Sequence, residues 1–325
     1  MRRSVLFAYL VLLLLSFGVA YVTWTREPGR DLSGSVAAFP CPREGLSGLE
    51  LKVGDRTVRC FQRKSAYSNK SFWWIDAAGE GFKASERFTE ALGRFCPWMA
   101  SRDLGVAGDE KKQEFGLAGS QDRLVLKVGA EQKAFRIGTA VYGSQDRYVE
   151  DEESGRVYLV RGQDLRDFEY PKSRFMERNF HGFDRERVTL VRVQSGGRTA
   201  EIVPVTEGGK TKGWADAASP TESKEALRNW MQKYFTLRFS DYVKPGDASE
   251  IMGCSAPTGA EEVFSLTFFD GNKEIGFFRL YRAAGTGEKE KALACADNTD
   301  CVVELPWTQA EGLVKDLETV LAGEP

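Results

Sequence analysis

The feature that most constrains this chain is an uncharged apolar run that extends from Ser4 to Trp24. A helix rises about 1.5 Å per residue, so a run of this length can cross a hydrocarbon layer about 30 Å thick. Arg2 and Arg3 precede the run, and basic residues there favour a cytoplasmic N-terminus. The run is therefore predicted to contact lipid as a single-pass anchor in a bacterial inner membrane. The rest of the chain would then form a body in the periplasm or another extracytoplasmic space.

A cleaved signal peptide is the alternative interpretation of the same run. The small residues at Gly18-Val19-Ala20 are ones that a signal peptidase accepts. The apolar core of a usual signal peptide spans about 7–15 residues, and this run is longer, which favours an anchor. Sequencing the N-terminus of the mature protein would distinguish the two.

The cysteine content agrees with an oxidising compartment, because an even number of cysteines permits disulfides. Cys295 and Cys301 flank a short turn and could face each other across a hairpin. Cys60 and Cys96 could meet between a strand and a helix, which would leave Cys41 with Cys254 by elimination. The alternative is that several of these cysteines are buried free thiols, since cysteine is among the most buried residue types.

The body is predicted to contain one α+β unit used twice. The proposed division is a membrane anchor at 1–24, a linker at 25–46, a first repeat at 47–170, a connector at 171–186 and a second repeat at 187–325. Alternating apolar residues predict mostly antiparallel strands in both repeats. Helices are expected over 83–99, from 163, over 221–235 and over 308–321.

The two repeats align with an offset near 140 residues, which places Trp74 on Trp214. Equivalent positions of this kind favour a shared role for the two tryptophans in the core of each repeat. The sequence thus predicts an N-terminal transmembrane helix followed by two similar sheet-plus-helix units made by internal duplication. The competing interpretation is that any two α+β stretches align loosely.

The chain offers little from which to build a catalytic or metal site. His181 is the only histidine, so a multi-histidine zinc site is excluded and a Ser-His-Asp triad would need this one residue. It lies in a polar connector, where a solvated or capping imidazole is expected. The acidic residues 150–153 are contiguous and are expected to form a solvated hairpin tip instead of a cation cage. No catalytic, cofactor-binding or metal-binding residue is predicted.

The charge composition argues against nucleic acid as a partner. The chain has 45 basic and 47 acidic residues and a formal net charge of −2, without a dense basic block. Proteins that bind nucleic acid usually present a basic face to the phosphates. No nucleic-acid partner is therefore expected.

The central segment resembles a known bacterial family. The stretches RIGTAVYGSQDRYVEDEESGRVYLVRGQDL and FMERNFHGFDRERVTLVRV are similar to the family called domain of unknown function 4340 (DUF4340). The matching positions are Gly138, Tyr148-Val149, Val157 to Val160, Phe183-Asp184 and Val188. The resemblance implies a single N-terminal transmembrane helix, an extracytoplasmic body and an association with ABC-type transport components related to those of gliding motility. It implies no catalytic residue.

These observations favour a non-enzymatic, membrane-anchored accessory protein of an ABC-type transport or cell-envelope system. Its expected partners are membrane lipid and a permease or associated envelope proteins. The alternative is an envelope module that binds a ligand or glycan through exposed aromatic residues. A carboxylate-based hydrolase is a third hypothesis, and it requires two acids less than about 10 Å apart in a cleft.

Overall fold

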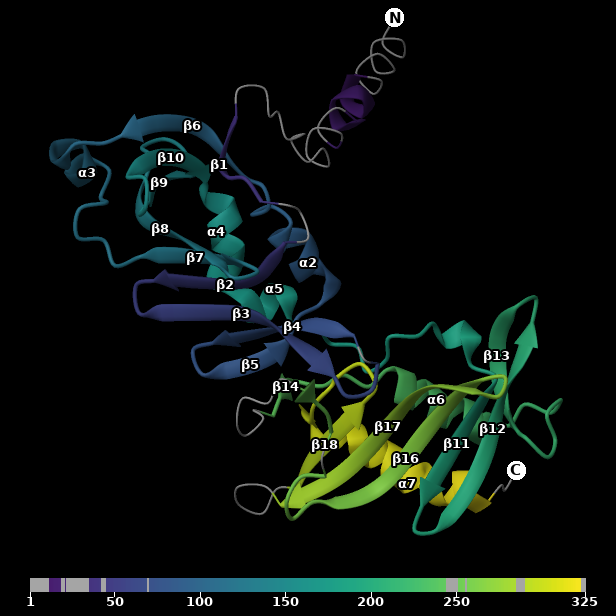
Figure 1. Cartoon of the computed structure of the whole chain (residues 1–325). Coiled ribbons are helices and arrows are strands. Elements are labelled where there is room, and N and C mark those ends of the chain that lie inside the picture. The colour runs from purple at the N-terminus through teal and green to yellow at the C-terminus, as the bar shows by residue number, and fades with distance from the viewer. Residues whose placement is uncertain are drawn as a thin grey trace, which may run out of the picture.

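A computed structural model of the chain describes residues 12–18, 21, 35–41, 45–68, 70–243, 251–254, 256–284 and 290–322 (Figure 1). Most of the predicted membrane anchor lies outside these residues. The part that is described, residues 12–18, is helical and its side chains are exposed. Within the described ranges, no helix is both long and apolar enough to cross a membrane.

The first sheet has 11 strands and curls around one helix, α4 (Figure 1). All its neighbouring strands are antiparallel except β15, which pairs in parallel with the end of β3. Apolar and polar residues alternate along β2, which places Leu49 and Leu51 on one buried face of the strand. This strand pairs with β3. In sheet order the strands are β1 (Val36–Phe39), β6 (Trp98–Val106), β10 (Arg156–Arg161), β9 (Asp146–Asp151), β8 (Glu131–Ala140), β7 (Arg123–Val128), β2 (Leu46–Val53), β3 (Arg56–Ser65), β4 (Ser71–Ala77) and β5 (Glu80–Lys83), with β15 (Ile251–Met252) beside β3.

The second sheet has eight strands, all antiparallel. Its order is β13 (Lys210–Asp216), β12 (Arg198–Glu207), β11 (Leu190–Ser195), β16 (Glu261–Asp270), β17 (Lys273–Ala284), β18 (Glu290–Ala296), β19 (Val303–Leu305) and β14 (Asp241–Tyr242). In the first sheet, β4-β3-β2-β7-β8-β9-β10-β6 form a run with the same connectivity. Numbered along the chain, each run of eight follows the order 3-2-1-5-6-7-8-4. The predicted α+β class with mostly antiparallel sheets is confirmed.

The helices occupy corresponding places in the two units. They are α2 (Glu86–Leu92), α3 (Asp109–Glu114), α4 (Gly162–Glu169), α5 (Pro171–Phe175), α6 (Glu225–Phe235) and α7 (Trp307–Ala322), with a 3-10 turn at Arg185–Arg187. In the second unit α6 and α7 pack together against the sheet, and the indole of Trp230 donates to the Leu313 carbonyl at 3.0 Å. The α2 and α6 helices each precede the fourth strand of their run, β6 or β14, and α4 and α7 each follow the eighth strand, β10 or β19.

Two helix predictions need correction at their ends. The helix expected over 83–99 covers only Glu86–Leu92, because Pro97 disfavours helical backbone before it and Trp98 begins β6. The helix expected from residue 221 begins instead at Glu225. The C-terminal helix is confirmed.

Part of the predicted linker is a strand. Val36–Phe39 forms β1, which pairs antiparallel with β6. The short apolar sequence VAAF lies next to Gly, Ser and Pro residues, so its strand pattern is only four residues long. The edge of β6 supplies the partner that makes this short segment a strand.

The disulfide pattern differs from the expected one. The structure joins Cys41 to Cys96, with Cα atoms 5.0 Å apart, and Cys254 to Cys295, with Cα atoms 6.0 Å apart. Cys60 and Cys301 are free and buried. The β1–β6 pairing explains the first bond, because Phe39 faces Trp98 and each cysteine lies two residues from that pair.

The predicted Cys295–Cys301 bond is wrong although the hairpin that suggested it is present as β18 and β19. Cys295 packs with Tyr281 and Leu293 in a small cluster, whereas Cys301 belongs to the main core. The two side chains therefore point to different clusters. The predicted Cys60–Cys96 bond is wrong because Cys96 pairs with Cys41.

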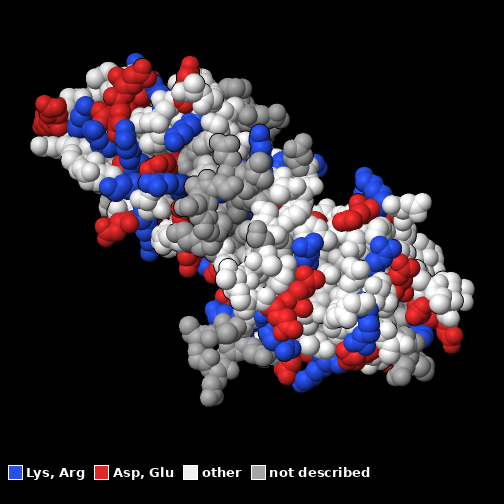
Figure 2. All heavy atoms as spheres, turned by 60° about the horizontal axis from the view of Figure 1, so that its bottom comes forward, with Lys and Arg blue, Asp and Glu red and all other residues white. Residues whose placement is uncertain are grey.

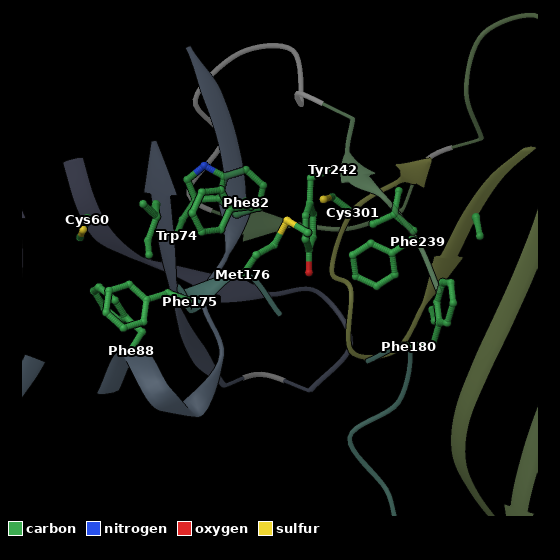
Figure 3. Packing of buried hydrophobic residues seen from close by; sticks show 14 of the residues in the cluster. Cys60, Trp74, Phe82, Phe88, Phe175, Met176, Phe180, Phe239, Tyr242 and Cys301 are labelled. Atoms are coloured by element: carbon green, nitrogen blue, oxygen red, sulfur yellow. The ribbon is translucent and has the colours of Figure 1, made fainter. Parts of the chain in front are cut away.

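The two units share one hydrophobic core. Figure 3 shows Trp74 and Met176 from the first unit lying next to Tyr242, Cys301 and Phe239 at the second. The rings of Trp74 and Tyr242 meet edge to face with centroids 5.8 Å apart. Because this packing is continuous, the two units form a single packed body.

Candidate functional site

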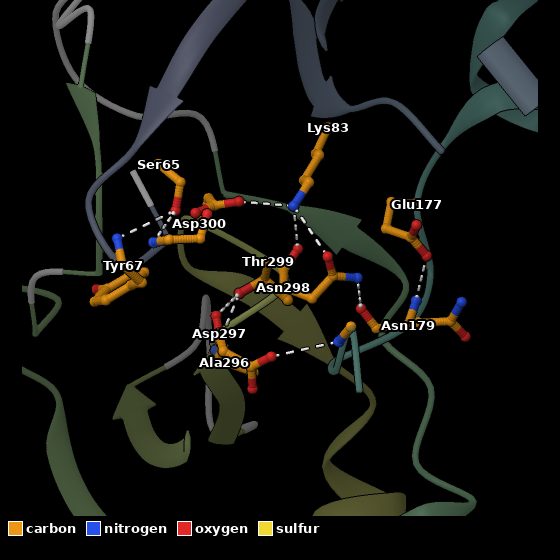
Figure 4. A network of polar contacts seen from close by, with 12 residues as sticks. Ser65, Tyr67, Lys83, Glu177, Asn179, Ala296, Asp297, Asn298, Thr299 and Asp300 are labelled. Carbon is orange, nitrogen blue, oxygen red and sulfur yellow. Dashed lines mark hydrogen bonds and ion pairs between the residues drawn. The ribbon is translucent and has the colours of Figure 1, made fainter. Parts of the chain in front are cut away.

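A cleft of about 940 Å³ lies between the two units, and we call it the inter-unit cleft. One wall comes from the β3–β4 connection and the start of α2, and the other from the connector and the β18–β19 turn (Figure 4). Ligand-binding pockets commonly measure about 300–1,000 Å³. The lining residues are Ser65, Tyr67, Ser68, Lys70, Ser71, Phe72, Lys83, Ser85, Glu86, Arg87, Glu177, Asn179, His181, Gly182, Phe183, Ile275, Asp297, Asn298 and Asp300.

Lys83 joins the two walls of the cleft. It ends β5, and its Nζ donates to the Asn298 carbonyl at 2.8 Å, to the Asn298 side-chain oxygen at 3.1 Å and to Asp300 Oδ2 at 2.7 Å (Figure 4). The Lys83 and Asp300 side chains are 12% and 2% exposed, so water screens this ion pair little. The three donors of the ammonium are all used, which makes Lys83 a structural link between the units.

His181 is also held between the walls, and the expectation of a solvated or capping imidazole is wrong. Its side chain is 10% exposed, and its Nδ1 lies 2.5 Å from Asp297 Oδ1. Its Nε2 makes a short hydrogen bond with the hydroxyl of Tyr234. Asp297 also accepts from the amides of Gly182 and Phe277. The connector is polar in sequence, but the imidazole of His181 packs against the rings of Phe183 and Phe268.

The hydrogen bonds of His181 involve both of its ring nitrogens. Burial, and then the charge of Asp297, raise the pKa of Tyr234 well above its usual value, so its hydroxyl keeps its proton. Asp297 lies at Nδ1 of His181, and the hydroxyl of Tyr234 lies at Nε2. Neither ring nitrogen is then left to move a substrate proton.

Gly276 in β17 makes room for this arrangement. A Cβ at this position would collide with the ring of Phe183 and with Asp297 Oδ1. We predict that Gly276→Ala lowers the free energy of unfolding by about 1–3 kcal/mol, because the displaced groups must shift in a packed site. Urea unfolding measures the change. Gly182→Ala is the matched control, since its Cβ would meet Asn298 only at 3.6 Å, and it should stay within about 0.5 kcal/mol of the wild type.

The acidic stretch 150–153 is not the solvated tip that its sequence suggested. Glu150 and Asp151 are buried, and Glu150 pairs with Lys112 and Arg136. Asp151 accepts from Lys133 and from the hydroxyl of Ser154. Basic residues on β8 and α3 thus neutralise the acids. In the described part of the chain, no group of three or more His, Cys, Asp or Glu residues is placed to hold a metal ion.

The tryptophans that the structure describes do not form an exposed binding surface. Trp74 and Trp214 are buried, which confirms their expected role in the core. Trp98 and Trp230 are also buried, and Trp73 and Trp307 are half-buried. Tyr67 is the aromatic residue of the cleft that is exposed, at 42%.

The inter-unit cleft was not predicted from the sequence. Its residues come from segments about 200 positions apart, such as Lys83 and Asp300, and none of them belongs to a recognisable motif. The only signal was indirect. His181 lies in a polar connector and Asp297 lies in the short turn between Cys295 and Cys301, and the structure joins the two residues by a hydrogen bond.

Comparison with known proteins gives one match. Residues 98–254 match the model of the family described as Domain of unknown function (DUF4340). This region begins with β6 of the first unit and ends at Cys254, so it includes the connector with His181. Among curated proteins and solved structures, none matches the chain. The family match agrees with the resemblance found in the sequence, and it identifies residues 98–254 as similar to the DUF4340 family.

Proposed function

We propose that this protein is a non-enzymatic accessory protein, anchored in a bacterial inner membrane, that serves an ABC-type transport or cell-envelope system. The observation that carries the proposal is the state of the polar groups in the inter-unit cleft. His181 and Lys83, the groups best suited to proton transfer, are already occupied by Asp297, Tyr234 and Asp300. A cleft arranged in this way favours binding over proton transfer by these two groups.

The anchor is supported by the character of residues 4–24. Leu12 to Leu15 and Phe17 are helical and each is more than half exposed. Exposed apolar side chains in such a series are unfavourable in water, at roughly 25 cal/mol for each Å² of apolar surface. Insertion into lipid removes this cost and would place the body outside the cytoplasm.

Internal duplication of the body is supported by its topology. The order 3-2-1-5-6-7-8-4 occurs in both sheets, and a helix stands at the same two points of each run. Trp74 and Trp214 are buried in the third strand of their respective runs. Two related units joined by one core provide a wide surface next to the membrane.

The surface charge supports a protein or neutral partner over nucleic acid. On the face drawn in Figure 2, basic and acidic side chains are interspersed over both units. Several form pairs across strands or helices, such as Arg192 with Glu201 and Lys233 with Asp316. Nucleic-acid binders instead gather basic residues on one face.

Affinity capture from native membranes tests the proposed partnership. The full chain, tagged at its C-terminus and solubilised in mild detergent, should recover a permease or an ATPase subunit of one ABC-type system. A chain with three charged substitutions in the apolar run, Leu12→Arg, Leu14→Arg and Phe17→Arg, should lose membrane association and recover neither subunit. Repeated capture of no transport subunit by the wild-type chain would contradict the proposed partnership.

A further inference from the structure

The inter-unit cleft has no excess of basic side chains. Three basic and four acidic side chains line it; Lys83 is paired with Asp300, and Asp297 accepts hydrogen bonds from the amides of Gly182 and Phe277. The charged groups that remain are Lys70 and Arg87 against Glu86 and Glu177. These two cations and two anions cancel, and the carboxylate of Asp297 would repel an anion, so the cleft has no field that would select a phosphate or a polyanion.

The open part of the cleft is rich in hydrogen-bonding groups that the protein itself does not use. The hydroxyls of Ser68, Ser71 and Ser85 and the side-chain amide of Asn179 line it. Among the described residues, the hydrogen bonds of Ser68 and Ser85 and of Asn179 involve their backbones and leave these side chains without a partner. Hydroxyl and amide groups can each donate and accept, which suits a ligand with many hydroxyls.

Tyr67 supplies an aromatic ring at the rim of the same cleft. Its hydroxyl is hydrogen-bonded to the backbone of Cys254, and its ring meets Phe277 edge to face with centroids 4.7 Å apart. Cys254 is in turn bonded to Cys295 in β18. Contacts on its hydroxyl and one edge fix the ring while it stays 42% exposed. Aromatic residues of this kind present an apolar face beside polar groups.

We infer that the inter-unit cleft binds an uncharged oligosaccharide. Such a ligand carries many hydroxyls and no net charge, and the C–H face of a sugar ring is apolar. These three properties match the free hydroxyl and amide groups, the cancelled charges and the fixed ring of Tyr67. The inference rests on the proposed function in one respect, because a non-enzymatic body outside the cytoplasm would meet envelope polysaccharide and leave it intact.

The test uses the full chain in lipid nanodiscs and isothermal titration calorimetry. The probes are tetrasaccharides of β-linked glucose, α-linked glucose and β-linked N-acetylglucosamine, with tetragalacturonate as the acidic probe and inorganic phosphate as the small anion. At least one neutral tetrasaccharide should bind in a saturable way. The inference is overturned if no neutral probe binds, or if tetragalacturonate or phosphate binds more tightly than all of them.

Variants locate the binding. Ser85→Ala and Asn179→Ala remove side-chain groups that have no internal partner, so each should weaken binding about 3–10-fold and leave the unfolding midpoint unchanged. Gln232→Ala, in the separate groove between α6 and α7, is the control and should bind as the wild type does. Equal affinity of all three variants would overturn the assignment to the cleft.

The same samples separate this inference from the proposed function. Mass spectrometry of the probes after incubation should find them intact. If the probes bind and are also cleaved, the non-enzymatic function is contradicted, but the inference that the cleft binds an oligosaccharide is still supported. If the chain captures transport subunits but binds no neutral tetrasaccharide, the proposed function is supported and the inference of an oligosaccharide ligand is overturned.

Discussion

Replacing Lys83 with methionine should destabilise the protein by about 3–5 kcal/mol, because the change leaves Asp300 buried without its cation. Among the described residues, Asp300 Oδ1 has no hydrogen-bond partner, so without Lys83 the buried carboxylate would have no compensating cation. Asn298 would lose its contacts at the same time. Chemical unfolding of Lys83→Met beside the wild type measures the effect.

Two variants test the stated cause of that loss. Lys83→Met combined with Asp300→Asn should recover part of the lost stability, because no buried charge remains. Lys172→Met is the matched control on the same seam between the units, where the lysine pairs with Glu80 and Asp241 in a more exposed setting. It should cost about 1 kcal/mol or less. Equal losses for Lys83→Met and Lys172→Met would contradict the account.

Removing the Cys254–Cys295 bond should be the second large effect. This bond ties the segment that follows β15, which is paired with β3 of the first unit, to β18 of the second. The double variant Cys254→Ser with Cys295→Ala removes the bond without leaving an odd thiol. We expect it to lower the free energy of unfolding by about 2–4 kcal/mol. Thermal or urea unfolding of the double variant under non-reducing conditions measures this.

Thiol counting and peptide mapping check the pairing itself. Burial raises the pKa of Cys60 and of Cys301, so the native protein should react slowly with a thiol reagent. After denaturation without reductant, two thiols should react, and mapping should find the Cys41–Cys96 and Cys254–Cys295 peptides. Finding no free thiol, or a Cys295–Cys301 peptide, would contradict the structure.

Much of the fold could be predicted because its determinants are local. Leu49 and Leu51 alternate with polar residues, and the Asp270-Gly271 turn separates two apolar runs that pair as β16 and β17. The offset between the two repeats places Trp74 and Trp214 at equivalent positions, and both are buried in the structure. The spacing of apolar residues and the residue types of a turn depend only on neighbouring positions, so both can be recognised in a single sequence.

The disulfides and the cleft depend on contacts that are distant in the sequence. Cys41 meets Cys96 because β1 pairs with β6. The residues around Cys41 do not predict this pairing. Cys254 reaches Cys295 only because β15 crosses to β3. Lys83 and Asp300 likewise meet where two sheets touch. Such meetings are set by the packing of whole elements, so local patterns did not reveal them.

The central claim is that the two units form one fixed body around a preformed cleft. Pulsed electron paramagnetic resonance distances test it most directly, with spin labels at Glu131→Cys, at the start of β8, and Asn272→Cys, in the β16–β17 turn of the full chain. The buried free thiols Cys60 and Cys301 should stay unlabelled under native, non-reducing conditions. The account predicts a single narrow distance distribution. A broad distribution, or two separate distances, would show units that move independently and would contradict it.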